Sequence, residues 1–425
     1  EKQYDQVFLV SAGDIFSGNP VVDVYDKKGY PMIDLMNRAG YDLTALGNHE
    51  FDYGQAVLAQ RMKDANFQFI CANINTQNTK LPQPKPYKIL EADGKKLLFI
   101  SLIETGNEGL PSTHPSKLKD LIFQDPIKSA NQFTDMAKNH DAFIGLTHLG
   151  LQSDKRLAQK YPEFDLIIGG HSHSFLDSAE KVNNTFITQA GDNLNYVGKT
   201  VLSFNNDELA DIHTEVVNLK KSKKKDEEVA SIIKKYNDNE ALNKIIGTAQ
   251  NPISGKEELG ALFTDAQVEM QNLDLAFQNN GGIRIGEIPE GEITVKTIYQ
   301  LDPFGNDLVK IEMKPDEIKS LIRNGYKRRN EPNMQIGGGS YTLYLSDEMN
   351  PERITIKNEA GKKLHTDSSY TVGLNSYVYK SYKFKHENNG ESLNSTTAQN
   401  MINFIKKKGR IDYSGVKRIH IKKEE

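Results

Sequence analysis

An amide, an imidazole and a carboxylate stand close together in the chain at Asn48, His49 and Asp52. They belong to the stretch Gly-Asn-His-Glu-Phe-Asp-Tyr-Gly at residues 47–54, which directly follows a predicted strand. An amide oxygen suits a hard, oxygen-preferring metal site that also holds a phosphate. A histidine followed by a carboxylate is typical of an oriented proton donor. The alternative interpretation is a strand-to-helix turn in which Asp52 caps the next helix.

Further candidate metal ligands also stand where predicted strands end, at Asp14, His148, His171 and His173. Ligands of open α/β sheets bind outside the carboxyl ends of the strands, so we expect these side chains to meet the stretch 47–54. A lone Gly-Asp or His-x-His pair is a weak signal, but the combination is not. A mixed set of nitrogen and oxygen donors suits Zn²⁺, Mn²⁺ or Fe²⁺. The sequence therefore predicts a divalent metal centre whose metal is left open.

The elements that must position these residues alternate along the first part of the chain. Short β-rich runs are predicted strands at residues 7–12, 43–46, 67–72, 96–102, 142–147 and 165–168. Helical patterns lie between them at residues 31–39, 55–65, 126–139 and 154–160. Later runs at 185–190, 200–205 and 213–219 follow one another without helices. The pattern predicts an α/β layered domain with a mixed sheet.

Length and composition limit the class of protein. A chain of 425 residues suggests two domains, and 37% hydrophobic residues suffice for globular cores. The net charge of −4 gives no electrostatic case for binding a nucleic acid polymer or a membrane surface. No run approaches the roughly 18 apolar residues of a membrane span. With one cysteine, Cys71, no intrachain disulfide forms, and a buried structural thiol is expected.

A lysine-rich run followed by acidic residues, at 220–228, interrupts the periodic pattern of apolar residues. It predicts a solvated linker. A connecting helix is predicted at residues 229–246. We accordingly expect a first domain at 1–219, a linker and connecting helix at 220–248, and a second domain at 249–425. The second domain has predicted helices at 259–272 and 315–323, and predicted strands at 340–345, 353–356 and 370–375.

These motifs together resemble one known family. Asp14, residues 48–52, His148 and residues 171–173 match, in order and spacing, the metallophosphatase domain of 5′-nucleotidases. In the second half, Gln-Asn-Asn-Gly-Gly-Ile-Arg at 278–284 resembles that family's substrate-binding loop, and the stretch at 303–309 resembles its Pro-Phe-Gly element. The resemblance covers nearly the whole chain. It implies a four-layer αββα metallophosphatase domain, a linker helix and a C-terminal α+β nucleotide-binding domain.

The resemblance also implies two divalent metal ions and a role for each ligand. The implied ligands are Asp14, bridging both ions, then Asn48, His148 and His171 on one ion, and His173 on the other. His49, oriented by Asp52, would contact the phosphate and stabilise the transition state or help the leaving oxygen. In the second domain Asn279 would face the nucleoside, Arg284 the phosphate, and Phe304 would form one side of an aromatic clamp on the base.

The chain departs from the family pattern in three places. The family opens with Asp-x-His on its first strand, and the 13 residues ahead of Asp14 contain none. We expect that this strand is missing, which leaves one metal held mainly by Asp14 and His173, too few ligands for tight binding. Lys256 is expected to replace a phosphate-facing arginine. A Gly-Gly-Asp-Gly-aromatic loop is not visible, and either Tyr382 or Phe384 is expected to complete the base clamp.

The resemblance implies metal-dependent hydrolysis of nucleoside 5′-monophosphates to nucleoside and phosphate. The alternatives are a phosphohydrolase for cyclic nucleotides or nucleotide sugars, and a nucleoside- or phosphate-binding protein without turnover. The expected partner is a small nucleotide, and the oligomeric state is left open. The family further implies an extracytoplasmic, bacterial protein of nucleotide catabolism.

Overall fold

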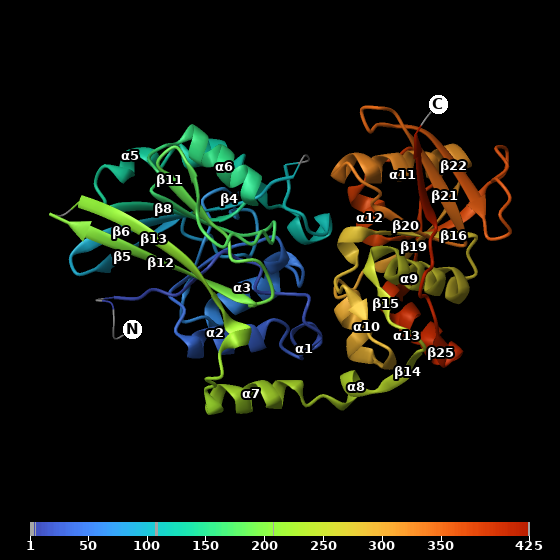
Figure 1. Cartoon of the computed structure of the whole chain (residues 1–425), viewed down its shortest axis with the longest axis horizontal. Coiled ribbons are helices and arrows are strands. Elements are labelled where there is room, and N and C mark those ends of the chain that lie inside the picture. The colour runs from blue at the N-terminus through green and yellow to red at the C-terminus, as the bar shows by residue number, and fades with distance from the viewer. Residues whose placement is uncertain (1–3, 5, 107–108, 207, 424–425) are drawn as a thin grey trace. The chain divides into compact units, whose positions relative to one another are not determined.

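The computed structural model describes residues 4, 6–106, 109–206 and 208–423 (Figure 1). The chain divides into two compact units, each with its own cores. Unit 1 consists of residues 1–17 and 24–238, and unit 2 consists of residues 18–23 and 239–425. Each unit is described by itself below.

Unit 1 contains two sheets and a long hairpin. The first sheet has the parallel order β1-β2-β3, with β1 (Val10–Ser11), β2 (Leu43–Ala45) and β3 (Gln68–Ile70). The second sheet is mixed, with the order β10-β11-β9-β8-β6-β5. Its strands are β5 (Tyr87–Ala92), β6 (Lys95–Ile103), β8 (Ala142–His148), β9 (Leu166–Gly169), β10 (Glu180–Val182) and β11 (Thr185–Thr188). The hairpin pairs β12 (Tyr196–Asn205) with β13 (Glu208–Asn218), and a short pair joins β4 (Ile74–Asn75) to β7 (Ile122–Phe123).

Side-chain alternation along the strands explains the layering of unit 1. Leu97 and Phe99 of β6 pack with Leu43 of β2 in a core between the two sheets. Leu98 and Ile100 point the other way, because successive side chains of a strand face opposite sides, and they pack against helices. The helices on that side are α4 (Pro126–Ala130), α5 (Thr134–Ala137) and α6 (Leu151–Lys160). The outer face of the first sheet is covered by α2 (Tyr30–Ala39) and α3 (Gln55–Asp64). The expected αββα order is therefore confirmed.

Two predicted helices are interrupted. The helix expected at 126–139 ends at Ala130 and restarts at Thr134, in a stretch that holds Asn131, a poor residue for a helix interior. The prediction of a single helix at 229–246 is wrong. It is divided into α7 (Glu227–Asn237) and α8 (Glu240–Asn243), and β14 (Ile245–Ala249) follows. The Asn239 side chain accepts a hydrogen bond from the backbone of Leu242, so it caps a new helix instead of continuing the old one.

Helix α7 packs on α2 within unit 1. Tyr236 donates its hydroxyl proton to Asp34 Oδ2 at 2.8 Å, and Arg38 Nη1 donates to Glu228 Oε1 at 2.9 Å. At its start the lysine-rich run forms a short 3₁₀ helix, η3 (Leu219–Lys221), before α7 begins. The two side-chain bonds hold α7 against the outer helical layer.

Unit 2 is built around a central mixed sheet with the order β20-β16-β23-β19-β24. Its strands are β16 (Leu275–Asn279), β19 (Asp307–Met313), β20 (Met334–Gly337), β23 (Tyr370–Asn375) and β24 (Glu391–Thr396). Smaller sheets have the orders β22-β21-β26, β18-β14-β25 and β15-β17. Their further strands are β15 (Ile253–Ser254), β17 (Glu287–Ile288), β18 (Gly291–Thr294), β21 (Gly339–Leu345), β22 (Pro351–Asn358), β25 (Arg410–Ile411) and β26 (Ile419–Lys423). The helices are α1 (Pro20–Asp23), α8, α9 (Gly255–Gln271), α10 (Val295–Leu301), α11 (Pro315–Arg329), α12 (Ser376–Ser381) and α13 (Thr397–Lys408).

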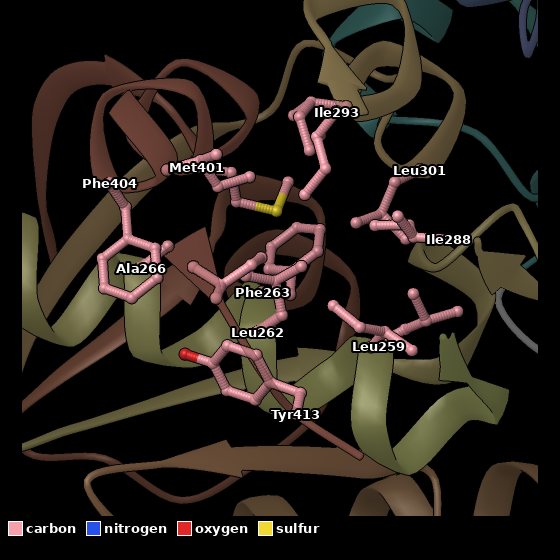
Figure 2. Close-up of a cluster of buried hydrophobic side chains, with 14 of the residues drawn as sticks. Leu259, Leu262, Phe263, Ala266, Ile288, Ile293, Leu301, Met401, Phe404 and Tyr413 are labelled. Atoms are coloured by element: carbon pink, nitrogen blue, oxygen red, sulfur yellow. The ribbon is translucent and has the colours of Figure 1, made fainter. Parts of the chain in front are cut away.

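Two cores stabilise unit 2. In the first, Leu262 and Phe263 of α9 meet Met401 of α13 and strand residues such as Ile293, as Figure 2 shows. In the second, α11 packs with β16, β20, β21 and β23. Helix α9 has apolar residues on most of its faces, which explains why so much of its middle is buried.

Cys71 is buried, as expected, and burial raises the pKa of its thiol to about 12. The thiol is therefore protonated and unreactive at neutral pH. In the described ranges, no helix has both the length and the apolar character needed to cross a membrane.

The core of unit 2 gives a stability prediction. Phe263→Ala removes a ring that is 1% exposed, and we expect it to lower the free energy of unfolding of unit 2 by about 3–5 kcal/mol. Urea titration followed by circular dichroism measures the change. The control is Ile421→Ala, whose side chain is 55% exposed and should cost less than about 1 kcal/mol. Equal effects of both substitutions would contradict the assignment of this core.

Candidate functional site

The ends of β1 and β2 are joined by one buried carboxylate, that of Glu50. The backbone N–H groups of Gly47 and Asp14 donate to Glu50 Oε2 at 2.5 and 3.1 Å, and that of Ile15 donates to Oε1 at 2.6 Å. The backbone N–H of His49 in turn donates to Asp14 Oδ1 at 2.9 Å. These bonds fix the two loops that carry the first candidate site residues.

Glycines allow the loops of this site to approach one another closely. A Cβ atom at Gly47 would lie 2.3 Å from Asp14 Oδ1 and 2.9 Å from Glu50 Oε2. At Gly170 it would lie 2.8 Å from the carbonyl oxygen of Ala12. Real side chains do not tolerate such distances, so both positions require glycine for a packing reason.

Asp14, Asn48, His148 and His171 bring their ligand atoms to one point. His148 Nε2 lies 3.0 Å from Asp14 Oδ2 and 3.2 Å from Asn48 Oδ1. His171 Nδ1 lies 3.1 Å from the same Asn48 oxygen. Asn48 Nδ2 donates to the carbonyl oxygen of Ser112 at 3.1 Å, which turns Oδ1 toward the imidazoles. The ligand atoms of the carboxylate and both imidazoles lie within 4.8 Å of one another, and this mixed set fits a divalent cation.

Hydrogen bonds and charges prepare these groups for a cation. His148 Nδ1 donates to the carbonyl oxygen of Ala12 at 2.7 Å, so Nε2 faces the group. Burial opposes the charge of Asp14, but the attraction of His148 and His49 outweighs it and lowers the carboxyl pKa. Burial likewise opposes charge on His148, yet Asp14 raises its pKa. Burial and His148 lower the pKa of His171 to about 3, which leaves that imidazole neutral with a lone pair to offer.

His49 and Asp52 form the expected pair. His49 Nδ1 lies 2.7 Å from Asp52 Oδ2, and His49 Nε2 lies 4.0 Å from Asp14 Oδ2. Asp52 also accepts hydrogen bonds from the hydroxyl groups of Ser17 and Thr113, both at 2.6 Å. Helix α3 takes Gly54 as its N-cap, so the structure does not support the alternative in which Asp52 caps that helix.

His173 lies apart from this group. Its side chain is 44% exposed, and its Nδ1 lies 3.6 Å from Asp192 Oδ2. Among the residues that the structure describes, the carboxylate and imidazole group consists of Asp14, His148 and His171. Asp14, His171 and His173 all have positive φ angles, of 58°, 74° and 56°. Such strained backbone clusters at functional sites, because the surrounding structure must hold it in place.

In unit 2, Asn279 is the last residue of β16 and precedes a 3₁₀ turn, η4 (Asn280–Gly282). Asn279 Oδ1 accepts from Asn375 Nδ2 at 3.1 Å and from Gln278 Nε2 at 3.3 Å. A Cβ at Gly282 would lie 2.0 Å from Gln278 Nε2, so a side chain there would displace the Gln278 amide. The amide oxygen of Asn279 is therefore held in a buried polar network at the edge of the turn.

The turn leads to a cluster of two cations and an aromatic ring. Lys256 Nζ donates to the carbonyl oxygen of Ile283. The guanidinium carbon of Arg284 lies 5.6 Å from the ring centre of Phe304. Burial and the charge of Arg284 lower the pKa of Lys256. Two like charges held near each other are suited to an anion that binds both.

Tyr382 and Phe384 do not lie as a base clamp requires. They are 7% and 8% exposed and belong to the core around α11. The Tyr382 hydroxyl oxygen accepts a hydrogen bond from Asn333 Nδ2 at 3.0 Å. Stacking on a base needs an open ring face, which these buried rings lack, whereas Phe304 is half-buried.

Several residues of the site carry no assignment from the sequence. Glu50 lies inside the Gly-Asn-His-Glu stretch, and its carboxylate beside the other candidate residues is the feature that could have identified it from the sequence. Burial and the charge of Asp14 raise its pKa to about 7. Ser112 and Thr113 come from the loop that follows β6, and Thr113 is 61 residues away from Asp52. No local pattern marks such a long-range contact.

Two family models match the chain. The model described as calcineurin-like phosphoesterase matches residues 1–175, and the model described as 5′-nucleotidase, C-terminal domain, matches residues 240–383. The first contains the group around Asp14, and the second contains Lys256, Arg284 and Phe304.

Individual relatives agree with these matches. The chain is 28% identical to the trifunctional nucleotide phosphoesterase protein YfkN of Bacillus subtilis, over 87% of its own length but only 29% of that protein. It is 28% identical to protein UshA of Yersinia enterocolitica, over 86% of this chain and 76% of UshA. The crystal structure of a 5′-nucleotidase precursor from Thermus thermophilus is similar with a TM-score of 0.85 at 25% identity, covering 98% of this chain and 90% of that one.

The close packing at Gly47 gives a prediction. Gly47→Ala would push Asp14 and Glu50 apart, and we expect the affinity for Mn²⁺ or Zn²⁺ to fall at least about tenfold. Calorimetric titration of the metal measures this. Gly198→Ala is the matched control in unit 1, because its Cβ would meet only Ala190 Cβ at 3.8 Å. Unchanged affinity in a folded Gly47→Ala protein would contradict the proposed ligand geometry.

Proposed function

Because the chain belongs to the family that joins a calcineurin-like phosphoesterase domain to a 5′-nucleotidase C-terminal domain, we propose that it hydrolyses nucleoside 5′-monophosphates to nucleoside and phosphate. The observation that carries the proposal is the convergence of Asp14, Asn48, His148 and His171 beside the His49–Asp52 pair. A cation site next to an oriented imidazole suits phosphate ester hydrolysis.

Asp14, Asn48, His148 and His171 would hold one divalent ion. The family resemblance gives Asp14 and His173 to a second ion, for which His173, which lies apart from this group, would have to approach Asp14. Such ions, when bound, activate water at neutral pH and neutralise charge on a transferring phosphoryl group. The metal itself is Zn, Mn or Fe, all of which suit a nitrogen and oxygen donor set.

His49 handles the proton on the leaving-group side. The Nδ1 N–H of His49 donates a hydrogen bond to Asp52, so Nε2 points away from Asp52 and toward the side of Asp14. A proton held at Nε2 can be donated to the oxygen that leaves with the nucleoside. Hydroxyl donors from Ser17 and Thr113 fix the Asp52 carboxylate, so the imidazole keeps its orientation.

Unit 2 recognises the nucleotide. Arg284 offers a planar pair of donors to the phosphate, and Lys256 adds a point charge. The half-buried ring of Phe304 stacks on the base, which is nearly independent of base identity. Asn279 faces the nucleoside. Tyr382 and Phe384 are not assigned to this clamp, because their rings are buried.

We further propose a location and a physiological role. The Thermus thermophilus relative is described as a precursor, a term used for chains from which a leader is removed. This supports an extracytoplasmic location. The role that we propose is nucleotide catabolism in a bacterium, since the proposed reaction degrades nucleotides.

The proposal is tested by phosphate release from a panel of nucleoside monophosphates, cyclic nucleotides and nucleotide sugars with added Mn²⁺ or Zn²⁺. We expect release from the 5′-monophosphates, and a fall in kcat of about 10²–10⁴-fold for His49→Gln with metal affinity retained. His213→Gln, on the exposed face of β13, is the control and should leave kcat unchanged. Release from none of the substrates overturns the proposal.

Base stacking gives a second prediction. Phe304→Ala should raise KM for nucleoside monophosphates about tenfold, while kcat/KM for p-nitrophenyl phosphate, which has no base, stays unchanged. Tyr344→Ala removes a comparable ring under Arg353, whose guanidinium carbon lies 3.6 Å from the ring centre, and it serves as the control. If both substrates were affected equally, Phe304 would not contact the base.

A further inference from the structure

The buried hydroxyl of Tyr382 belongs to a chain of hydrogen bonds that ends at the turn η4. Asn333 Nδ2 donates to the Tyr382 hydroxyl oxygen at 3.0 Å. The backbone N–H of Asn280, the first residue of the turn, donates to Asn333 Oδ1 at 3.2 Å and to the Asn333 carbonyl oxygen at 3.1 Å. Asn333 and Tyr382 are 3% and 7% exposed, so water does not replace these partners freely.

Tyr382 determines the orientation of the Asn333 side-chain amide. An N–H donor such as that of Asn280 needs an oxygen opposite it, so the Asn333 amide nitrogen must face the other way. On that side it meets the hydroxyl oxygen of Tyr382. Without that acceptor the buried amide nitrogen loses its partner, and the amide is no longer held in the orientation that serves Asn280.

The side chain of Asn280 is held by residues close to Asn333 in the chain. Its Nδ2 donates to the carbonyl oxygen of Pro332 at 3.0 Å, and its Oδ1 accepts from Gln335 Nε2 at 2.8 Å. The turn is thus fixed at Asn280 by residues on and just before β20. Asn279 precedes this fixed residue and Arg284 follows the turn, so both depend on its placement.

We propose that Tyr382 is a positioning residue for nucleotide binding, acting through Asn333 on the turn that places Asn279 and Arg284. This inference rests on the proposed function for its ligand, a nucleoside 5′-monophosphate. In this inference Tyr382 contributes through its hydrogen bond with Asn333 and not by stacking on the base. Burial raises the pKa of the Tyr382 phenol to about 12, so the hydroxyl is neutral at working pH.

The test compares Tyr382→Phe with Tyr326→Phe. Tyr326 is 3% exposed in the same core and donates its hydroxyl proton to the carbonyl oxygen of Met349 at 2.9 Å, away from the turn. Each variant loses one buried hydroxyl group. We expect Tyr382→Phe to raise KM for a nucleoside monophosphate about two- to tenfold with kcat unchanged. Tyr326→Phe should leave KM unchanged.

Hydrogen exchange of the metal-free, ligand-free chain separates this inference from the proposed function. In Tyr382→Phe, the backbone amide of Asn280 should exchange about two- to tenfold faster than in the unchanged protein, whereas Tyr326→Phe should leave it unchanged. An unchanged exchange rate in Tyr382→Phe overturns the inference, whatever the enzymatic result. Faster exchange in a chain that hydrolyses no nucleotide supports the positioning role and overturns only the proposed function.

Discussion

The candidate metal centre depends on the carboxylate of Glu50. This group is fully buried and accepts three backbone N–H bonds, two of them from the loop after β1 and one from the loop after β2. Three donors on one carboxylate offset the cost of burying it, and they hold two separate loops at a fixed distance. The left-handed conformation of Asp14 follows from this constraint, since its backbone N–H must point at Glu50 and its carboxylate at the imidazoles. A strand end alone would leave that direction undetermined.

A second connection comes from the loop after β6. The carbonyl oxygen of Ser112 orients the amide of Asn48, and the hydroxyl of Thr113 binds Asp52. Neighbouring residues of one loop therefore hold a candidate metal ligand and the carboxylate that orients His49. Movement of this loop would disturb both at once, so the cation site and the proton donor are mechanically coupled in unit 1.

The sequence predicted the site residues whose positions follow from the ends of parallel strands. It did not predict features that depend on contacts between segments far apart in the chain. Asp14, Asn48, His148 and His171 each follow or end a parallel strand, and parallel strands bring their carboxyl ends to the same edge. The interruption of the predicted helix at 229–246 could have been found, because Asn239 is a typical cap. The burial of Tyr382 could not have been predicted. Its ring is buried because it packs in the core around α11, a helix about 60 residues earlier in the chain.

The chemistry of the donor set explains why the group around Asp14 suits a cation. Asp14 Oδ2 and Asn48 Oδ1 are acceptors, and His148 Nε2 and His171 Nδ1 lie within hydrogen-bond distance of them, each able to carry a proton or, without it, to offer a lone pair. The hydrogen bonds from Asn48 to Ser112 and from His148 to Ala12 prevent these groups from turning away from one another. Protons on the ring nitrogens, or one cation at the point of convergence, can hold these oxygens together. A proton between His148 and Asp14 satisfies two of the groups, whereas a divalent ion would contact all four, so we expect metal and protons to compete for this candidate site.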